Sequence, residues 1–345
     1  MIRRILDRLK KYWRHTPLGR TRKCSYPIRW GVIGLGYMAE TFSCAIDGNK
    51  NGVVYAVASR SLAKAKSFAS HHGNCKAYGN YEEMVNDKEL NLDVVYIATP
   101  VKYHYEHVKL CLEAGLNVLC EKPITSTLEQ FEDLVAIAKG NNCFFMEGMW
   151  MKCLPTFQKA CQWVNEGKIG KTELVKVDFY KREHICEGYA IYNAKEGGGV
   201  LHDFGVYAIA FMEHFIGGMP EDLNRKCRIS ASGIDADWLI TAEKNGINAI
   251  VNLSSNFGSL SKAAIIGSDG FIEFDSQFNR TKHVTLYDSK GQQVENFSTP
   301  YIYEGFEYEV NEVQKNISGG KKESQIVTLV GTHNTMQIID KLKKV

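Results

Sequence analysis

The feature that most constrains the fold is a glycine-rich turn near the amino terminus. Residues 30–39 read WGVIGLGYMA, a short apolar run that breaks at Gly34-Leu35-Gly36 and then resumes with a helical pattern. A G-x-G-x-x-A turn of this kind joins a strand to a helix: Gly34 allows the tight turn, Gly36 lets the backbone approach a pyrophosphate, and Ala39 lets the helix pack closely on the strand. Because the amides at a helix start bind anions, we expect the phosphates of a dinucleotide there.

The first half of the chain alternates apolar, strand-like runs with helical patterns. Strands are expected at Val53–Ala58, Val94–Ala98, Asn117–Cys120 and Cys143–Met146, and helices at Leu62–His71, Tyr103–Ala114 and Leu128–Lys139. The run at 94–98 is apolar throughout, as in a strand covered on both faces. This alternation predicts an α/β fold with a parallel, doubly wound Rossmann sheet over residues 26–150, and a nucleotide bound beyond the carboxyl ends of its strands.

The end of the second strand indicates the type of dinucleotide. A fold that prefers NAD usually has an acidic residue there, which binds the ribose 2′-hydroxyl. Here the strand ends in Ala58-Ser59-Arg60-Ser61, without a carboxylate, and Arg60 and Lys64 are four residues apart at the start of a helix. Such residues can face the same way, and arginine suits a phosphate. We therefore predict a clamp for the 2′-phosphate of NADP, with NAD the less favoured cofactor; the alternative is an ordinary solvated basic residue.

The amino-terminal segment differs in charge from the rest of the chain. Residues 1–25 contain nine Lys or Arg residues and one acid, and so carry +8; the whole chain carries +3, which leaves the remainder at −5. A body of negative net charge gives no electrostatic support to nucleic-acid binding. The apolar residues of the segment fall on one face of a helix: Ile2, Ile5, Leu6, Leu9 and Trp13. Such a basic amphipathic helix can lie on an anionic membrane surface or dock a partner protein, and a dispensable extension is the alternative.

Length and composition indicate a cytoplasmic protein with two domains. At 345 residues, 44% of them hydrophobic, the chain is long for one domain and can bury sizeable cores. Ten cysteines occur without a C-x-x-C pair, as small buried hydrophobes do in a reducing compartment. His184 and Cys186 have no nearby partners at ligand spacing, so no metal site is predicted. No apolar stretch approaches the roughly 20 residues that span a bilayer, so we expect at most a peripheral position at the inner face of a membrane.

From about residue 151 the pattern changes from alternation to strands in succession. Strands are expected at Thr172–Tyr180, Ile247–Leu253, Ala263–Ile266, Gly270–Phe274 and Val284–Tyr287, followed by helices at Phe306–Ser318 and Val327–Lys343. Strands in succession suggest an antiparallel open sheet, which defines a second domain over residues 151–345. One face of such a sheet would need covering, and this predicts a homodimer or a higher homo-oligomer.

Three motifs carry residues suited to acid–base chemistry. Glu121-Lys122-Pro123 directly follows a predicted strand, and the sequence MEGMW at 146–150 has the same position at the next strand. The third motif, GGGVLHDFGVY at 197–207, is a glycine run that opens a helix, on which Asp203 and Tyr207 are four residues apart and share a face. A lysine, a carboxylate and a phenol brought to one nicotinamide ring would form an acid–base set.

At these residues the chain resembles the Gfo/Idh/MocA oxidoreductases, a family named for glucose-fructose oxidoreductase and inositol dehydrogenase. The resemblance runs from about Ile28 to Lys343 and is strongest to the branch of dimeric dihydrodiol dehydrogenases and NADP-dependent D-xylose dehydrogenases. The matching motifs, in chain order, are Gly34-x-Gly36-x-x-Ala39, Ala58-Ser59-Arg60, Thr99-Pro100 with His104, Glu121-Lys122-Pro123, Met146-Glu147 with Trp150, and the block from Gly197 to Tyr207. The resemblance implies a Rossmann domain joined to a substrate-binding and dimerisation domain with a large mixed or antiparallel open sheet.

The resemblance also implies a role for each matching residue. Lys122 would stabilise a developing alkoxide, Tyr207 would exchange a proton with the substrate oxygen, and Asp203 would orient the substrate or the Tyr207–Lys122 pair. Trp150 and Phe179 would line the substrate pocket. Contacts to the cofactor are expected from Gly34, Gly36, Tyr37, Met38, Ser59, Arg60, Lys64, Thr99, Pro100, His104, Glu121 and Lys122. The implied activity is that of an NADP-dependent dehydrogenase or reductase acting on CH–OH groups.

Departures from the branch bear on the substrate. The branch tends to have an arginine where Lys152 stands, and residues 181–196 add polar side chains near the expected pocket. These differences favour a sugar, polyol or sugar derivative over an aromatic diol. Two other functions stay open: a glycosidase of the same fold that retains its dinucleotide, and a non-catalytic NADP-binding sensor or scaffold. Individual residues also have structural alternatives, such as core packing for Tyr207 and a helix-capping or surface role for His104.

Overall fold

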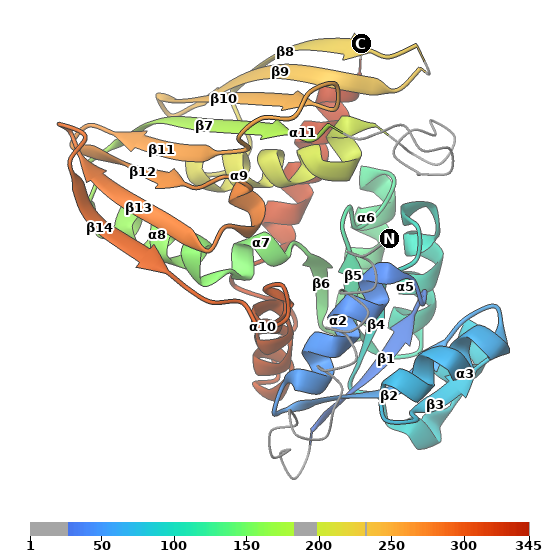
Figure 1. Cartoon of the computed structure of the whole chain (residues 1–345). Coiled ribbons are helices and arrows are strands. Elements are labelled where there is room, and N and C mark those ends of the chain that lie inside the picture. Colours follow the sequence, from blue (N-terminus) through green and yellow to red (C-terminus); the bar gives the residue numbers. More distant parts are fainter. Residues whose placement is uncertain (1–26, 183–198, 232, 345) are drawn as a thin grey trace. The chain divides into compact units, whose positions relative to one another are not determined.

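The computed structural model describes residues 27–182, 199–231 and 233–344, which form two compact units (Figure 1). The first unit contains residues 27–124, 133–148 and 301–324, and the second contains the other described residues. The boundary between residues 148 and 149 lies two residues before the predicted one, which falls between residues 150 and 151. The sequence analysis assigned residues 301–324 to the second domain, whereas the structure groups them with the first unit. The basic segment 1–25 lies outside the described residues.

The first unit is built on a six-stranded sheet in the order β3-β2-β1-β4-β5-β6. Its strands are β1 (Ile28–Ile33), β2 (Gly52–Ala58), β3 (Lys76–Tyr78), β4 (Val94–Ile97), β5 (Asn117–Glu121) and β6 (Phe145–Gly148). The helical elements are α2 (Tyr37–Gly48), α3 (Leu62–His71), α4 (Tyr81–Asn86), η2 (Lys88–Leu90), η3 (Val101–Tyr103), α5 (His104–Glu113), α6 (Leu128–Gly140) and α10 (Phe306–Ser318). Every strand pair is parallel, which confirms the predicted doubly wound sheet.

Helix α10 packs in this unit through apolar contacts that the local sequence pattern does not predict. The Phe42 ring on α2 lies 5.8 Å from the Trp30 ring, 4.1 Å from the Tyr96 ring and 5.8 Å from the Phe306 ring, measured between centroids. A Cβ atom on Gly52 would come within 2.2 Å of the Gln314 side chain. The Gln314 side chain of α10 therefore packs directly against the backbone at the start of β2.

The second unit is built on an eight-stranded sheet in the order β14-β13-β12-β11-β7-β10-β9-β8. Its strands are β7 (Thr172–Tyr180), β8 (Asp222–Ile229), β9 (Asp235–Lys244), β10 (Ile247–Ser254), β11 (Ala263–Gly267), β12 (Gly270–Phe274), β13 (His283–Asp288) and β14 (Gln293–Ser298). The helical elements are α7 (Trp150–Cys153), α8 (Pro155–Asn165), the π-helix η6 (Leu201–Gly205), α9 (Val206–Ile216), η7 (Phe278–Arg280) and α11 (Leu329–Lys343).

The sheet is mixed rather than fully antiparallel. Strands β7 and β10 pair in parallel, while every other pair is antiparallel. The strands in succession, β8-β9-β10 and β11 to β14, do form antiparallel meanders. The parallel pair arises because the chain passes through α9 between β7 and the first meander, and a helical crossover permits parallel pairing.

One face of this sheet is covered by helices. Helix α9 packs on β7 and β10, and α11 packs on α9 (Figure 1). An aromatic cluster lies in the core of this unit, with Phe211 of α9 at its centre. Its ring centroid is 4.7 Å to 5.8 Å from those of Phe157, Phe215, Phe274 and Phe278. The opposite face alternates partly exposed polar and apolar side chains. On it Leu239 is 45% exposed, and the Phe271 and Tyr287 rings stack 4.6 Å apart.

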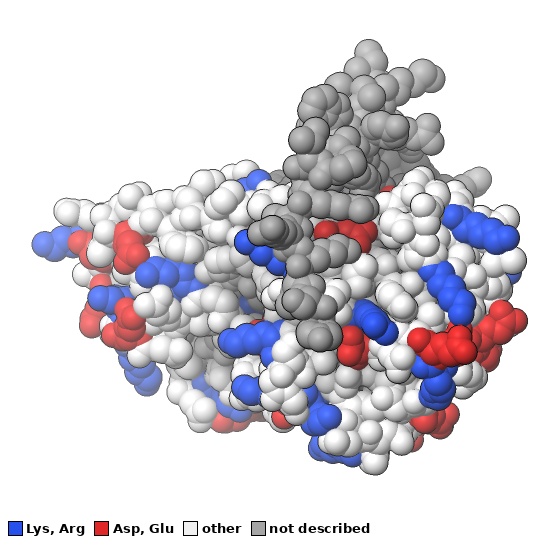
Figure 2. Space-filling model, turned by 90° about the horizontal axis from the view of Figure 1, so that it is seen from below, with Lys and Arg blue, Asp and Glu red and all other residues white. Residues whose placement is uncertain are grey.

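Strands β3, β8, β9 and β14 were not predicted. Strands β8 and β14 are mostly exposed edge strands of the sheet and lack an apolar face, so a periodicity argument cannot find them. Strand β9 does alternate, with Ala236, Trp238, Ile240 and Ala242 buried, and this signal was available. Of the helices in the described part of the chain, none combines the length and apolar composition that crossing a bilayer requires. Basic and acidic side chains intermingle on the face shown in Figure 2.

Candidate active site

The glycine-rich turn has the geometry expected of a phosphate-binding loop. Gly34 has a φ of +87°, and a Cβ atom there would lie 2.5 Å from the Thr99 backbone nitrogen, so no other residue fits. Gly36 is the N-cap of α2, and no side chain caps this helix. The space next to Gly36 is open, because no described atom lies within 4 Å of where a Cβ atom would be. Ala39 is fully buried against the sheet. An anion can therefore approach the first amides of α2, which fits the pyrophosphate of a dinucleotide.

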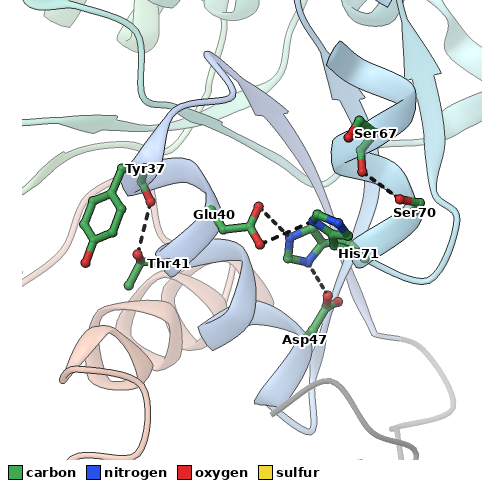
Figure 3. Close-up of polar contacts among 8 residues, drawn as sticks. Tyr37, Glu40, Thr41, Asp47, Ser67, Ser70 and His71 are labelled. Atoms are coloured by element: carbon green, nitrogen blue, oxygen red, sulfur yellow. Dashed lines mark hydrogen bonds and ion pairs between the residues drawn. The ribbon is translucent and has the colours of Figure 1, made fainter. Parts of the chain in front are cut away.

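An acidic residue in the first turn of α2 is turned away from that turn (Figure 3). The carboxylate of Glu40 lies 3.6 Å from Nδ1 of His71 and 3.8 Å from Nε2 of His72. Nδ1 of His72 lies 2.8 Å from Asp47 at the other end of the helix. Burial opposes protonation of His72, but its hydrogen bond to Asp47 and the nearby carboxylate of Glu40 raise its pKa overall. This arrangement partly neutralises a carboxylate that would otherwise repel a phosphate at the helix start.

The predicted residues after β4 form a compact backbone junction. Thr99 is buried, Pro100 is exposed, and the imidazole of His104 is 1% exposed. Nε2 of His104 lies 2.6 Å from the Thr99 carbonyl oxygen, and Nδ1 lies 3.0 Å from that of Pro123. Burial lowers the pKa of His104. The side chain ties the end of β4 to the segment after β5, and its part in cofactor binding remains a prediction.

A cluster of buried acids lies behind the Lys122 backbone. Glu121 accepts hydrogen bonds from the Tyr96 hydroxyl at 2.5 Å and from the Lys122 backbone nitrogen at 3.2 Å. Glu147 accepts one from the Ile124 backbone nitrogen at 3.2 Å. Burial, followed by repulsion from Glu121 and Glu147, raises the pKa of Glu309 well above its ordinary range. Lys122 itself is partly exposed at the end of β5, so its ammonium can reach a ligand bound at this edge of the sheet.

The residues after β2 also lie where the sequence predicts. Ser59 is buried and its hydroxyl accepts a hydrogen bond from the Ser61 backbone nitrogen, while Arg60 and Lys64 are exposed. Arg60 lies over the ring of Tyr103, with Cζ 6.0 Å from the centroid. Tyr37 is 75% exposed and Met38 partly exposed in the first turn of α2. No acidic residue follows β2, so the end of this strand can accept a 2′-phosphate as well as a hydroxyl.

In the second unit the structure brings together two predicted substrate residues, Trp150 and Tyr207, which are 57 positions apart. The indole Nε1 of Trp150 donates a hydrogen bond to the phenolic oxygen of Tyr207 at 3.0 Å, and the side chains are 7% and 9% exposed. Because an indole nitrogen can only donate, the Tyr207 oxygen accepts here and its own proton points elsewhere. The phenol is therefore buried, and its oxygen is oriented by the indole.

The helix that carries Tyr207 begins with a π-turn, η6, which is a rare element and often marks a functional site. Gly199 precedes it with a φ of +127°, and a Cβ atom there would collide with the carboxylate of Asp235. That carboxylate accepts hydrogen bonds from the Leu201 backbone nitrogen and the Trp238 indole, both at 2.7 Å. Gly199 therefore lets Asp235 anchor the start of the helix.

The remaining predicted residues of this unit have different surroundings. The carboxylate of Asp203 lies in η6, where the spacing rules of an α-helix do not apply, and is 3.9 Å from the Lys181 ammonium. A shared face for Asp203 and Tyr207 therefore stays a prediction. Phe179 is 7% exposed and packs against Phe204 and Phe278 at 4.9 Å and 5.2 Å, within the aromatic core. Most of residues 181–196 lie outside the described residues.

Lys152, noted as a departure in the sequence, is buried in an ion pair. Its ammonium lies 3.4 Å from Glu213, and the other carboxylate oxygen of Glu213 accepts a hydrogen bond from Asn334 at 3.0 Å. Sequence reasoning missed this pair, along with the contacts of Lys102, Tyr103 and His107 near Arg60. For the last three, the position directly after a strand of the parallel sheet was an available signal.

Fold and site together define an α/β protein with a dinucleotide-binding unit and a second unit carrying a buried, oriented tyrosine on a large mixed sheet. Residues 28–149 match the Gfo/Idh/MocA oxidoreductase family, NAD-binding Rossmann fold, and residues 157–273 match its C-terminal domain. The chain belongs to this family and is an NAD(P)-binding oxidoreductase.

Named relatives and solved structures agree with this assignment. The chain is 29% and 30% identical to trans-1,2-dihydrobenzene-1,2-diol dehydrogenases of Xenopus tropicalis and Xenopus laevis, over 90% of this chain and 96% of each relative. A 3-ketoreductase from Actinomadura kijaniata, in complex with NADP and TDP-benzene, matches with a TM-score of 0.79 and 23% identity over 92% of this chain and 97% of that one. A levoglucosan dehydrogenase in complex with NADH and levoglucosan matches with a TM-score of 0.82 and 18% identity, covering 92% and 96%. At these identities the structures support the fold alone.

Proposed function

We propose that this chain is an NADP-dependent dehydrogenase or reductase that acts on a hydroxyl or carbonyl carbon of a sugar, polyol or sugar derivative. The observation that carries the proposal is the buried phenol of Tyr207, whose oxygen accepts the Trp150 indole proton and whose own proton is directed elsewhere. The bound nicotinamide supplies or accepts the hydride. The chain has to supply the proton exchange and the charge that accompany this transfer.

In this proposal Tyr207 exchanges a proton with the substrate oxygen. In the direction of oxidation it receives the hydroxyl proton as the carbon loses its hydride, and in the direction of reduction it returns that proton. Lys122 would stabilise the negative charge that develops on the oxygen, because an ammonium group is a cation at neutral pH. Asp203 orients the substrate, and Trp150 holds Tyr207 in place.

The proposed substrate class rests on the ligands of similar proteins and on the polar side chains near Tyr207. The named relatives act on dihydrodiols, and one solved structure holds levoglucosan, so that hydroxylated rings recur. The polar pair Asp203–Lys181 adjoins the element that carries Tyr207, and the side chains are 38% and 50% exposed. Carboxylate and ammonium groups recognise hydroxyls by hydrogen bonding, which favours a polyhydroxylated ligand over an aromatic diol.

The test is a panel of sugars, polyols, sugar phosphates and an aromatic dihydrodiol, each with NAD and NADP, followed by the absorbance of reduced nicotinamide. We expect turnover of at least one sugar or polyol with NADP. Turnover of the dihydrodiol alone would overturn the substrate proposal, and cleavage of a glycoside without net reduction of the dinucleotide would favour a glycosidase.

Variants of the tyrosine test the mechanism. Tyr207→Phe should lower kcat about 10²- to 10⁴-fold, the range for losing a general acid–base group, and leave NADPH binding intact. Trp150→Phe keeps a ring but removes the indole N–H, and should lower kcat by roughly tenfold. Tyr287→Phe is the matched control, since Tyr287 lies on the other face of the sheet, stacked on Phe271. Unchanged turnover in Tyr207→Phe would remove this residue from the mechanism.

We also propose that the open face of the second sheet forms a homodimer interface. Leu239 is 45% exposed on this face, and partly exposed Leu174, Ile250 and Phe271 share it. An exposed apolar patch on a sheet marks an interaction surface. Light scattering should give twice the chain mass, and Leu239→Lys should reduce it; a monomeric wild-type chain would contradict the proposal.

The basic segment 1–25, with its charge of +8, is proposed to dock a cytoplasmic enzyme on an anionic membrane surface. Sedimentation with phosphatidylserine vesicles should carry down the full chain but not a chain that lacks residues 1–25. Equal sedimentation of both would contradict it.

A further inference from the structure

Two cations lie on one tyrosine ring at the carboxyl edge of the first sheet. The ammonium of Lys102 is 5.0 Å from the centroid of Tyr103, and the guanidinium carbon of Arg60 is 6.0 Å from it. The charge of Arg60 also acts on Tyr81, where it opposes the rise in pKa that burial causes. Arg60 follows β2, while Lys102 and Tyr103 follow β4, and β1 with its glycine-rich turn lies between these strands. The cations therefore come from the strand ends on either side of that turn.

The Tyr103 ring is held by a stack of side chains. Its centroid is 6.0 Å from that of His107, with the planes 27° apart, and His107 meets the Tyr81 ring edge-on at 4.6 Å. Nδ1 of His107 lies 3.0 Å from the hydroxyl oxygen of Thr99, the residue against which Gly34 packs. The ring that carries the cations is thus connected, contact by contact, to the backbone of the glycine-rich turn.

The stack adds no further positive charge. Burial and the nearby Arg60 lower the pKa of His107, while Glu106 and Glu82 act in the opposite direction. The imidazole is therefore neutral near pH 7 and serves as a flat surface. Two cations that share one ring repel each other, and an anion placed between them removes this repulsion. The arrangement favours a dianionic group such as a phosphate.

We propose that Arg60 and Lys102, held on the Tyr103 ring, form a two-cation site for the 2′-phosphate of NADP, so that Lys102 and Tyr103 set the preference for NADP over NAD together with Arg60. This inference rests on the proposed NADP-dependent function and deepens it. It assigns the second cation to Lys102 rather than to Lys64. In the described structure the Lys64 backbone nitrogen bonds the Ser61 cap, and the Lys64 ammonium lies in no ion pair or ring contact.

The experiment is calorimetric titration of the full chain with 2′,5′-ADP, which carries the 2′-phosphate, and with 5′-AMP, which lacks it. Lys102→Gln should weaken 2′,5′-ADP binding by about tenfold, the usual effect of losing one charged hydrogen bond, and leave 5′-AMP unchanged. Tyr103→Leu should weaken it by roughly three- to fivefold, because two cation–π contacts are lost. Tyr103→Phe keeps the ring and should bind as the wild type does.

A second lysine–tyrosine pair provides matched controls. Lys109 lies over the ring of Tyr105 at 5.6 Å, on the helix that follows Tyr103. Lys109→Gln and Tyr105→Leu remove an ammonium group and an aromatic ring, as the test variants do, but from α5. Both variants should bind 2′,5′-ADP and 5′-AMP as the wild type does. Lys64→Gln tests the lysine that the sequence predicts for the clamp, and should weaken 2′,5′-ADP binding less than Lys102→Gln does. A loss in Lys64→Gln without one in Lys102→Gln would overturn the assignment.

The outcomes separate this site from the proposed function. If Arg60→Ala weakens 2′,5′-ADP binding while Lys102→Gln and Tyr103→Leu do not, the two-cation site is wrong and the NADP proposal stands. If the wild type binds both nucleotides equally, the NADP proposal fails and the site fails with it. If Tyr103→Leu weakens both nucleotides alike, Tyr103 supports the fold and does not select the phosphate. Should Tyr103→Leu fail to fold, Lys102→Gln against Lys109→Gln still decides the question.

Discussion

The first unit buries three carboxylates around one phenol, whereas the second buries a lysine and a glutamate that face each other. Glu121, Glu147 and Glu309 are 9%, 3% and 1% exposed, next to the fully buried Tyr96. In the described chain Lys152 is the one buried lysine or arginine, and it lies 3.4 Å from Glu213 in the second unit. The first unit thus concentrates buried carboxyl groups, and the second pairs its buried carboxylate with a lysine.

This difference shows two ways of placing an ionisable group in a protein core. A carboxyl group without a counter-charge can keep its proton, which fits the raised pKa of Glu309. A lysine and a glutamate can both stay charged if they face each other and hydrogen bonds satisfy them, as Asn334 does for Glu213. The first arrangement makes stability depend on pH, and the second makes it depend on both partners being present.

The largest effect is expected from Lys152→Met. Removing one partner of a buried ion pair leaves an uncompensated charge on Glu213, and should lower the free energy of unfolding by about 3–5 kcal/mol. Urea denaturation of the full chain measures this change. The double variant Lys152→Met with Glu213→Leu should recover most of the loss, because neither charge is then buried. A single variant as stable as the wild type would show that the pair is not what holds this part of the core.

Glu309→Gln should raise the free energy of unfolding, whereas Lys152→Met lowers it. The folded state binds the Glu309 proton to a higher pH than the unfolded chain, whose glutamates titrate near about 4.3. Its stabilisation is therefore complete below that pH and is lost as the pH rises through the folded pKa. Glutamine does not titrate, so the variant should unfold at higher urea concentration than the wild type at about pH 8, by roughly 1–2 kcal/mol. A less stable variant at that pH would contradict protonation of Glu309.

A smaller dependence on pH is expected from His72. Its pKa is raised overall, since the hydrogen bond to Asp47 and the nearby carboxylate of Glu40 outweigh burial. Its contribution to stability is therefore complete below about pH 6.5 and is lost as the pH rises through the folded pKa. His72→Gln should therefore narrow the difference in unfolding free energy between about pH 6 and pH 8, by roughly 1 kcal/mol. His71→Gln is the matched control, because the His71 side chain is 56% exposed. If His71→Gln narrowed the difference as much as His72→Gln does, the pH dependence of stability would not be specific to the buried His72.

The smallest effect concerns a neighbour of the ion pair. Burial, and then the charge of Lys152, lower the pKa of His214 to about 4. Its NMR signals should therefore stay constant between about pH 5 and pH 8, whereas an ordinary histidine titrates near 6.5. In Lys152→Met the midpoint should move upward. A His214 midpoint near 6.5 in the wild type would show that neither its surroundings nor the charge of Lys152 shifts its protonation.

The parts of the site that were predictable from the sequence depend on local geometry. The glycine turn, the exposed Arg60 and the position of Lys122 at a strand end follow from residues within a few positions of each other, because a tight turn and a parallel strand restrict which residues fit. Strand β9 was equally readable and was overlooked. The edge strands β8 and β14 were not readable, since they bury too little for a period to appear.

The sequence by itself determined a parallel dinucleotide-binding sheet, the family, and the residue types that acid–base chemistry needs, because periodicity and short motifs encode local conformation. Only the tertiary structure decided that Trp150 donates to Tyr207, that Lys152 pairs with Glu213, and that α10 packs in the first unit. It also placed Lys102 and Arg60 on one ring. These contacts join positions that are 42 to 264 residues apart, and no local pattern specifies which buried side chains will meet.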